Sequence, residues 1–258
     1  MVNKILFFDI DGTILDEEKN IPIGVKEAIH EARKNGHEIV IATGRAPFTA
    51  KFIFDQLKIE SFICYNGQIV QFKGKVIHKG VIGKKELQQL TDFAKKREQP
   101  VVYMNNDEFV SNITDHPDVF ESISSLKISL PRTEENFFVE NDIHQALIFG
   151  DSDNQKEYEK EFPNLKFVRW HRTSCDVLPE GVSKAKGIAL LLKYINKSAE
   201  DAIAFGDGLN DIEMLEYVGT GVAMGNSVEQ LKKHATFVTN HVSENGLINA
   251  LKKLQLIQ

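Results

Sequence analysis

The stretch "FFDIDGTILD" at residues 7–16 joins an apolar run to two aspartates, Asp9 and Asp11, that are separated by one residue. The run that leads into it, "KILFF" at residues 4–8, is typical of a strand buried in a sheet. Carboxylates are costly to bury unless they are paired, hydrogen-bonded or bound to a metal ion. We therefore expect both aspartates to have a partner that the neighbouring sequence does not supply.

Strand-like and helix-like segments alternate in the first part of the chain. Apolar runs typical of buried strands cover residues 4–8, 37–43 and 61–66. Between them, residues 22–36 repeat apolar side chains at the spacing of one helical face and end at a glycine, and residues 46–57 show a second helical pattern. This order predicts a parallel sheet with helices on both faces.

The pattern changes after residue 65 and later returns. Residues 68–80 predict a hairpin that turns at Lys73 and Gly74. Helices mixed with alternating strands follow, and then helix and strand patterns alternate again to the end of the chain. We therefore predict an α/β protein, with a Rossmann-like parallel-sheet core (1–82 and 182–258) interrupted by an inserted α+β cap domain (83–181).

Composition narrows the class of protein. The chain has 258 residues and a net charge of −6, which argues against a nucleic-acid partner because such proteins need a basic face. No apolar run is long enough for a membrane span, and the first residues lead directly into the first strand, so we expect a cytoplasmic protein without a signal peptide. Cys64 and Cys175 are expected to be free thiols, and a disulfide between them remains the alternative. No obligatory protein partner is evident from the sequence.

A second acidic motif follows a later strand. "AIAFGDGLND" at residues 202–211 places Asp207 and Asp211 after an apolar run, as Asp9 follows the first strand. Ligands bind at the carboxyl ends of parallel strands, so Asp9, Asp11, Thr43 and Asp207 should meet at one edge of the sheet. We expect a cation to be shared there by Asp9 and Asp207. Oxygen ligands without histidine or cysteine suit Mg²⁺. A metal site with a further carboxylate, such as Asp11, suggests phosphoryl transfer through attack of one carboxylate on phosphorus.

Four motifs in order carry a family resemblance. "DIDGT", "ATGR", "GVSKAKG" and "GDGLND" resemble the conserved motifs of the haloacid dehalogenase-like (HAD) phosphatase superfamily. The second motif ends at Arg45 and the third begins at Gly181. This long interval, together with "YNG" and "GDGLNDIEML", is similar to the Cof-type subfamily (IIB), which has a larger α/β (C2-type) cap. The resemblance covers essentially the whole chain.

The resemblance implies a role for each motif residue. Asp9 would be the nucleophile and a metal ligand, and Asp11 the general acid/base that also offers its backbone carbonyl to Mg²⁺. Asp207 would bind the metal and Asp211 would support the metal shell. Five residues would hold the phosphate: Ile10 through its backbone, Thr43 through its hydroxyl, Gly44 through its amide, and Lys184 and Asn210.

Some assignments leave alternatives. Lys184 and Lys186 both fit the third motif, and "GVSK" favours Lys184, with Lys186 a solvated residue. Arg45 either contacts substrate or braces its loop, and we favour bracing. Arg172 belongs to the basic and aromatic cluster "RWHR" at 169–172, which either recognises the substrate or is an alternating, half-exposed strand. The acidic run "DEEK" at 16–19 is interpreted as a solvated loop.

The predicted function is a Mg²⁺-dependent phosphatase of small phosphorylated metabolites, sugar phosphates above all, that acts through an aspartyl-phosphate. A phosphotransferase or phosphomutase of sugar phosphates is the nearest alternative, since phosphomannomutases resemble this core and cap. A non-catalytic metabolite-binding regulator is a second alternative. It is disfavoured because a regulator need not keep a nucleophile and an acid/base together.

Overall fold

The computed structural model describes residues 3–258, which form two compact units. The core unit contains the residues up to Arg45, Ala50–His78 and Ser183–Gln258. The inserted unit contains Ala46–Thr49 and Lys79–Val182. None of the helices formed by residues 3–258 is long and apolar enough to cross a membrane.

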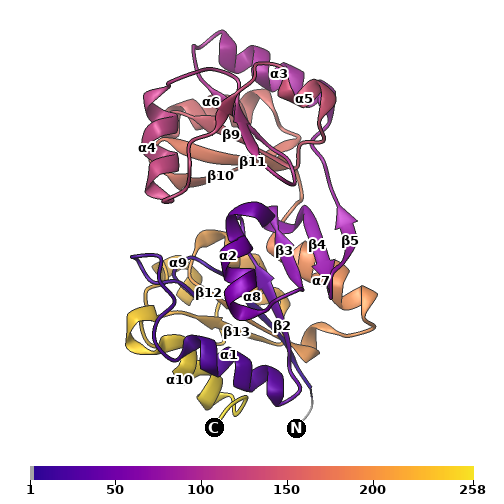
Figure 1. The fold of residues 1–258 in the computed structure, drawn as a ribbon, viewed down its shortest axis with the longest axis vertical. Helices are drawn as coiled ribbons and strands as arrows, with labels where there is room; N and C mark the ends of the chain where they lie inside the picture. Colours follow the sequence, from indigo (N-terminus) through magenta and orange to yellow (C-terminus); the bar gives the residue numbers. More distant parts are fainter. Residues whose placement is uncertain (1–2) are drawn as a thin grey trace. The chain divides into compact units, whose positions relative to one another are not determined.

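An eight-stranded sheet forms the centre of the core unit, in the order β14-β13-β12-β1-β2-β3-β4-β5 (Figure 1). The strands from β14 to β3 are parallel, and β4 runs antiparallel to β3. Lys73 and Gly74, both at positive φ, form the predicted hairpin turn between β4 and β5. In chain order the strands are β1 (Ile5–Phe8), β2 (Glu38–Ala42), β3 (Phe62–Cys64), β4 (Ile69–Phe72), β5 (Lys75–Lys79), β12 (Ala202–Gly206), β13 (Thr220–Ala223) and β14 (Phe237–Val238).

Helices bury both faces of the parallel strands, as the continuous apolar runs predicted. All four residues of β1 are buried. Ile5 and Phe7 belong to a cluster with apolar side chains of α7 and α8, whereas Phe8 stacks on Phe205 with ring centroids 4.8 Å apart. The helices of the core unit are α1 (Val25–Lys34), α2 (Pro47–Leu57, of which the residues from Ala50 on belong to this unit), α7 (Lys184–Tyr194), α8 (Ile212–Tyr217), α9 (Glu229–Lys232) and α10 (Gly246–Lys253).

The inserted unit has its own six-stranded sheet, in the order β10-β11-β9-β6-β7-β8. Neighbouring strands are antiparallel except β7 and β8, which are parallel. A separate apolar core that includes Tyr103, Phe138 and Tyr158 holds helices against this sheet. The elements are β6 (Val101–Met104), β7 (Phe109–Ser111), β8 (Arg132–Thr133), β9 (Gln145–Phe149), β10 (Leu165–His171), β11 (Ser174–Pro179), α3 (Lys84–Lys95), α4 (Pro117–Ser125), α5 (Phe137–Glu140) and α6 (Ser152–Glu161).

The register of three central strands determines where the acidic residues lie. Phe8 at the end of β1 is paired with Phe205 of β12 on one side and with Ile41 of β2 on the other. The three strands therefore end at the same edge of the sheet. This α/β core with an inserted α+β unit confirms the predicted fold class.

Candidate active site

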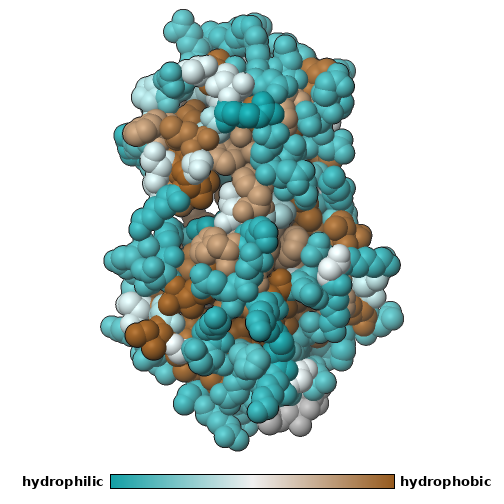
Figure 2. Space-filling model, viewed as in Figure 1, coloured by the Kyte–Doolittle hydropathy of each residue, from teal (hydrophilic) through white to brown (hydrophobic). Residues whose placement is uncertain are grey.

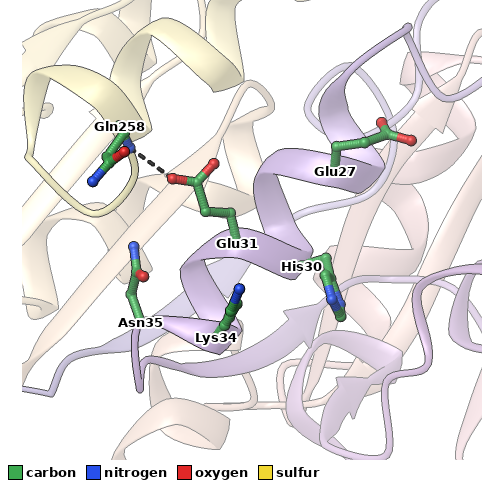
Figure 3. Close-up of a pocket in the computed structure, with 6 residues that line it drawn as sticks. All are labelled: Glu27, His30, Glu31, Lys34, Asn35 and Gln258. Carbon is green, nitrogen blue, oxygen red and sulfur yellow. Dashed lines mark hydrogen bonds between the residues drawn. The ribbon is translucent and has the colours of Figure 1, made fainter.

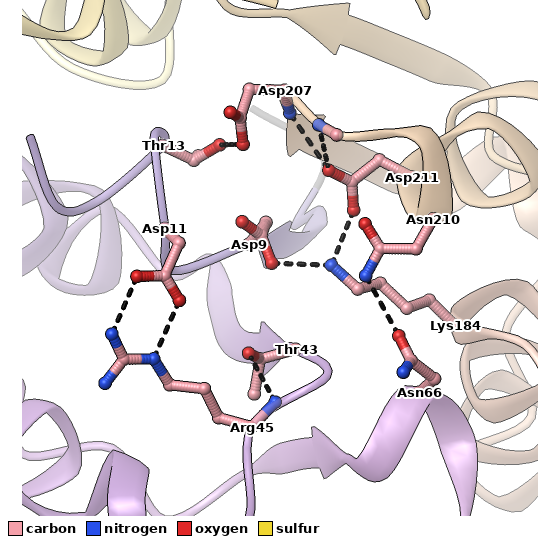
Figure 4. Close-up of polar contacts among 11 residues, drawn as sticks. Asp9, Asp11, Thr13, Thr43, Arg45, Asn66, Lys184, Asp207, Asn210 and Asp211 are labelled. Atoms are coloured by element: carbon pink, nitrogen blue, oxygen red, sulfur yellow. Dashed lines mark hydrogen bonds and ion pairs between the residues drawn. The ribbon is translucent and has the colours of Figure 1, made fainter. Parts of the chain in front are cut away.

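The polar residues that follow β1, β2 and β12 are anchored by backbone hydrogen bonds at the sheet edge. The Asp9 N–H donates to the Phe205 carbonyl at 3.0 Å, and the Thr43 N–H donates to the Ile63 carbonyl at 2.8 Å. Asp207 comes directly after β12. Figure 4 shows their side chains around a common space, as the strand-end rule predicted.

A buried lysine joins two carboxylates at the centre of this site. The Lys184 Nζ lies 2.5 Å from Asp9 Oδ1 and 2.6 Å from Asp211 Oδ1, and its side chain is 0% exposed. Carboxylate oxygens of Asp9, Asp207 and Asp211 all lie within 4.8 Å of one another and could hold a metal ion. Lys186, the other candidate for the third motif, is exposed, as expected. The structure therefore brings Lys184 rather than Lys186 into the site.

Asp211 is engaged through both of its oxygens. While Oδ1 accepts from Lys184, Oδ2 accepts from the backbone N–H groups of Asp207 and Gly208, each at 2.9 Å (Figure 4). By contrast, the Asp207 carboxylate accepts a long hydrogen bond of 3.4 Å from Thr13 Oγ1. Asp211 thus holds the Asp207 loop and the lysine in place. Of the three carboxylates that could hold a metal ion, those of Asp9 and Asp207 are less engaged by other groups.

The electrostatics of the cluster follow from burial. Burial raises the pKa of Asp9, and the charge of Lys184 only partly offsets this rise. The pKa of Asp207 is also raised, first by burial and then by repulsion from Asp9. Burial alone would lower the pKa of Lys184, but its two carboxylate partners outweigh burial and raise it. The lysine therefore stays charged, but its single positive charge does not neutralise the carboxylates around it.

Asp11 has different partners. Its carboxylate forms a bidentate ion pair with Arg45, through Nε and Nη2 at 2.7 Å each, and a third contact with Lys19 Nζ at 2.7 Å. Burial by itself would raise the pKa of Asp11, but Arg45 and Lys19 outweigh burial and lower it to about 2. Figure 4 shows Asp11 turned toward Arg45 while Asp9 faces Lys184.

Lys19 lies in the run that the sequence suggested was a solvated loop, and this interpretation was wrong for the lysine. The side chain of Asp16 accepts from the Asn20 N–H, and Lys19 takes a left-handed backbone conformation with φ 64°. The resulting turn brings the lysine back onto Asp11. A turn-forming Asp-x-x-x-Asn pattern was the available signal, but its partner could not be read from it.

The expected phosphate-binding residues surround the same space. Thr43 Oγ1 accepts from the Arg45 N–H at 3.1 Å, and Asn210 Nδ2 donates to Asn66 Oδ1 at 3.0 Å. A Cβ on Gly44 would lie 3.1 Å from Asn66 Nδ2, so this glycine allows close approach of the two loops. Ile10, between the two aspartates, is fully buried, which leaves only its backbone for a ligand.

Asn66 is a site residue to which we assigned no role from the sequence. It is buried, it lies in the short 3₁₀ segment Tyr65–Gly67 at φ 52°, and its N–H donates to the Thr43 carbonyl at 3.0 Å. The residues after Cys64 therefore leave the strand earlier than the predicted end at 66. The dipeptide Asn-Gly signalled a turn, but not that its side chain would face Asn210.

Arg172 belongs to the inserted unit and is exposed. It forms an ion pair with Glu121, and His171 Nε2 lies 3.8 Å from the same carboxylate. Arg169 of the same cluster is a structural residue, because its guanidinium donates to four main-chain carbonyls, those of Gly150, Asp151, His171 and Arg172.

Two further features lie outside the strand-end site. A surface pocket on α1 is lined by Glu27, His30, Glu31, Lys34, Asn35 and Gln258, and the Gln258 N–H donates to Glu31 at 2.8 Å (Figure 3). None of the predicted site residues lines it. Cys64 and Cys175 are both buried free thiols, as expected, and no disulfide joins them.

The fold and this site define a hydrolase of the HAD type. The sequence model of the haloacid dehalogenase-like hydrolase family matches residues 6–251, so the chain belongs to that family. The resemblance carried by the four motifs is thereby confirmed.

Known relatives narrow the class further. The chain is 45% identical over 258 residues to "Putative phosphatase YkrA" of Bacillus subtilis (strain 168), with 100% of both chains covered. The structure of BT1666, from the phosphatases of the HAD superfamily in Bacteroides thetaiotaomicron, is 30% identical with a TM-score of 0.91, covering 99% of this chain and 96% of that one. The HAD subclass IIB sugar phosphatase BT4131 is 30% identical with a TM-score of 0.89, covering 99% and 100%. The protein is a Cof-type HAD phosphatase, and this class acts on small phosphorylated substrates.

Proposed function

We propose that this phosphatase requires Mg²⁺ and hydrolyses phosphate monoesters of small metabolites, sugar phosphates above all, through a phosphoaspartate on Asp9. The observation that carries the proposal is the contact of Asp9 with the buried Lys184, beside Asp207. Similarity along the whole chain to the sugar phosphatase BT4131 supports the substrate class.

The donor set fits Mg²⁺. Asp9 and Asp207 offer carboxylate oxygens that lie close together. The Asp11 backbone carbonyl would be a third ligand, as the family resemblance implies. Mg²⁺ is commonly held by few protein oxygens together with waters. Asp211 contributes by holding the Asp207 loop, since its own oxygens are engaged. When bound, the cation neutralises charge on the phosphate oxygens.

The chain's own residues account for both half-reactions. A carboxylate oxygen of Asp9 attacks phosphorus, the bond from phosphorus to the ester oxygen breaks, and the leaving oxygen takes a proton from Asp11. A water molecule then gives a proton to Asp11 and attacks phosphorus, which releases inorganic phosphate and restores Asp9. Lys184 stays within reach of the nucleophile and is charged throughout.

Arg45 connects substrate binding with the state of Asp11. Arg45 and Lys19 favour the ionised form of Asp11, which suits a base but not an acid. A phosphate dianion bound beside Thr43 would compete for these cations, and its negative charge would raise the pKa of Asp11. The ion pair of Arg45 with Asp11 is thus part of the proposed catalytic cycle.

The remaining assignments concern binding. The backbone at Ile10, the hydroxyl of Thr43, the amide of Gly44 and the side chain of Asn210 would hold phosphate oxygens. Residues of the inserted unit, Arg172 among them, would select the leaving group. We propose 83–181 as the substrate-specificity cap and 1–82 with 182–258 as the catalytic core.

Phosphate release from a panel of phosphorylated metabolites tests the function. We expect activity to be lost after chelation, to return with Mg²⁺, and not to return with Ca²⁺, whose looser coordination would misplace the nucleophile. Undiminished turnover in chelator would contradict the metal assignment. With a hexose 1-phosphate, inorganic phosphate supports a phosphatase, whereas an isomerised sugar phosphate would support the mutase alternative.

A further inference from the structure

The loop that follows β13, residues Met224–Val228, contacts both acidic motifs although it carries no acidic residue. The Met224 N–H and Ser227 Oγ donate to the Gly206 carbonyl at 3.0 and 3.3 Å. The Val228 N–H donates to the Asp207 carbonyl at 3.2 Å. This loop therefore holds the backbone of the Asp207 segment from one side.

Asn226 of the same loop reaches the first acidic motif. Its Nδ2 donates to the Gly12 carbonyl at 2.8 Å, and its Oδ1 accepts from the Val242 N–H at 2.9 Å. Because one partner is an acceptor and the other a donor, both bonds exist in only one orientation of the amide. Asn226 thus links the "DIDGT" turn to the segment that begins at Val242.

Gly12 lies directly against the Asp207 carboxylate. A Cβ at Gly12 would lie 2.1 Å from Asp207 Oδ2, and the glycine has φ 77°. The next residue, Thr13, donates to the same carboxylate at 3.4 Å (Figure 4). Any shift of the Gly12 turn would therefore change the space available to Asp207 and its distance from Asp9.

We infer that Asn226 is a positioning residue for the cation: it sets the separation of Asp9 and Asp207 by holding the Gly12 turn, without touching metal or substrate. This inference rests on the proposed function, in which these two carboxylates bind Mg²⁺. Residues that orient metal ligands affect metal affinity without being ligands themselves.

Calorimetric titration of the metal-free full chain with Mg²⁺ tests the inference, using Asn226→Ala and Asn226→Asp. The aspartate keeps an acceptor for Val242 but has no donor for the Gly12 carbonyl, and it adds a negative charge. The alanine removes the same donor without adding charge, so a loss shared by both variants is assigned to the bond with Gly12. We expect both variants to bind Mg²⁺ about ten-fold more weakly or worse. At saturating Mg²⁺, KM for a phosphate ester should stay within about two-fold of wild type, because the role concerns the metal and not the substrate.

Asn35→Ala is the matched control, because Asn35 Nδ2 also donates to a main-chain carbonyl, that of Leu256, at 2.8 Å. It should lose a similar amount of thermal stability while binding Mg²⁺ as wild type does. Unchanged affinity in either Asn226 variant, or an equal loss in the control, would overturn the inference and leave the proposed function standing. A wild-type protein that hydrolyses esters without binding Mg²⁺ would overturn both the metal assignment and this role.

Discussion

Replacing Lys184 by methionine removes the cation that contacts both Asp9 and Asp211 while keeping a side chain of similar length. The lysine side chain is 0% exposed, and those of Asp9 and Asp211 are 9% and 1% exposed. Removing one partner of a buried ion pair costs about 3–5 kcal/mol, because a charge remains buried without compensation. We expect a loss of that size in the unfolding free energy at neutral pH, together with loss of phosphatase activity.

The pH dependence distinguishes a charge effect from a packing effect. A carboxyl whose pKa is raised on folding gives its full stabilisation below its unfolded pKa of about 3.9, and this stabilisation is lost as the pH rises through the folded pKa. Burial already raises the pKa of Asp9, and without Lys184 it rises further. The deficit of Lys184→Met should therefore be largest at neutral and alkaline pH and should shrink as the pH falls toward about 4.

Urea denaturation of the metal-free protein at several pH values measures this deficit. Lys186→Met is the control on the same helix, and because its side chain is exposed it should stay within about 0.5 kcal/mol of wild type. Activity is compared at a temperature at which all three proteins are folded. A deficit for Lys184→Met that does not change with pH, or wild-type stability at neutral pH, would refute the electrostatic reasoning.

Two further predictions concern catalysis and specificity. Asp11→Ala should still be phosphorylated by an aryl phosphate, because the leaving group of this substrate needs little protonation. The variant should hydrolyse the phosphoaspartate about 10²–10⁴-fold more slowly than wild type, so rapid-quench kinetics should show a burst of about one equivalent of aryl alcohol. Steady turnover at the wild-type rate would exclude Asp11 as the acid/base. Arg172→Ala should alter the preference among sugar phosphates and barely change the rate of hydrolysis of a small aryl phosphate. Arg132→Ala, which also breaks ion pairs in the inserted unit, is the control and should leave the preference unchanged. Equal losses of activity on all substrates would indicate a structural role for Arg172.

Much of the fold follows from local pattern. Continuous apolar runs predicted strands buried on both faces, and the helical spacing of Val25, Ala28, Ile29 and Ala32 matches the buried side of α1. The strand-end rule then brought Asp9 and Asp207 to one edge without further information, because parallel strands in register must end together.

The parts that sequence alone did not supply depend on contacts between distant segments. The early end of β3 is one example: a Cβ at Gly67 would lie 2.4 Å from the Ser183 carbonyl, so the turn at Tyr65–Gly67 is shaped by the segment that leads into α7. Lys19 and Asn226 are others, since their partners Asp11 and Gly12 are identified only once the loops are folded. Residue type indicated a turn or a loop in each case, but not its partner.

The contacts of Lys184 identify the role of the third motif, which its sequence indicated only weakly. A lysine as the first residue of α7 opposes the helix dipole, which is by itself only a weak indication of an anionic partner. In the structure it faces two carboxylates, with a third nearby. Three carboxylates against one ammonium leave a net charge of −2 when all four groups are ionised, which is the charge that one divalent cation neutralises. Because Asp211 is committed to backbone N–H groups and to the lysine, a divalent cation bound as we propose would rest on Asp9 and Asp207, whose pKa values burial raises.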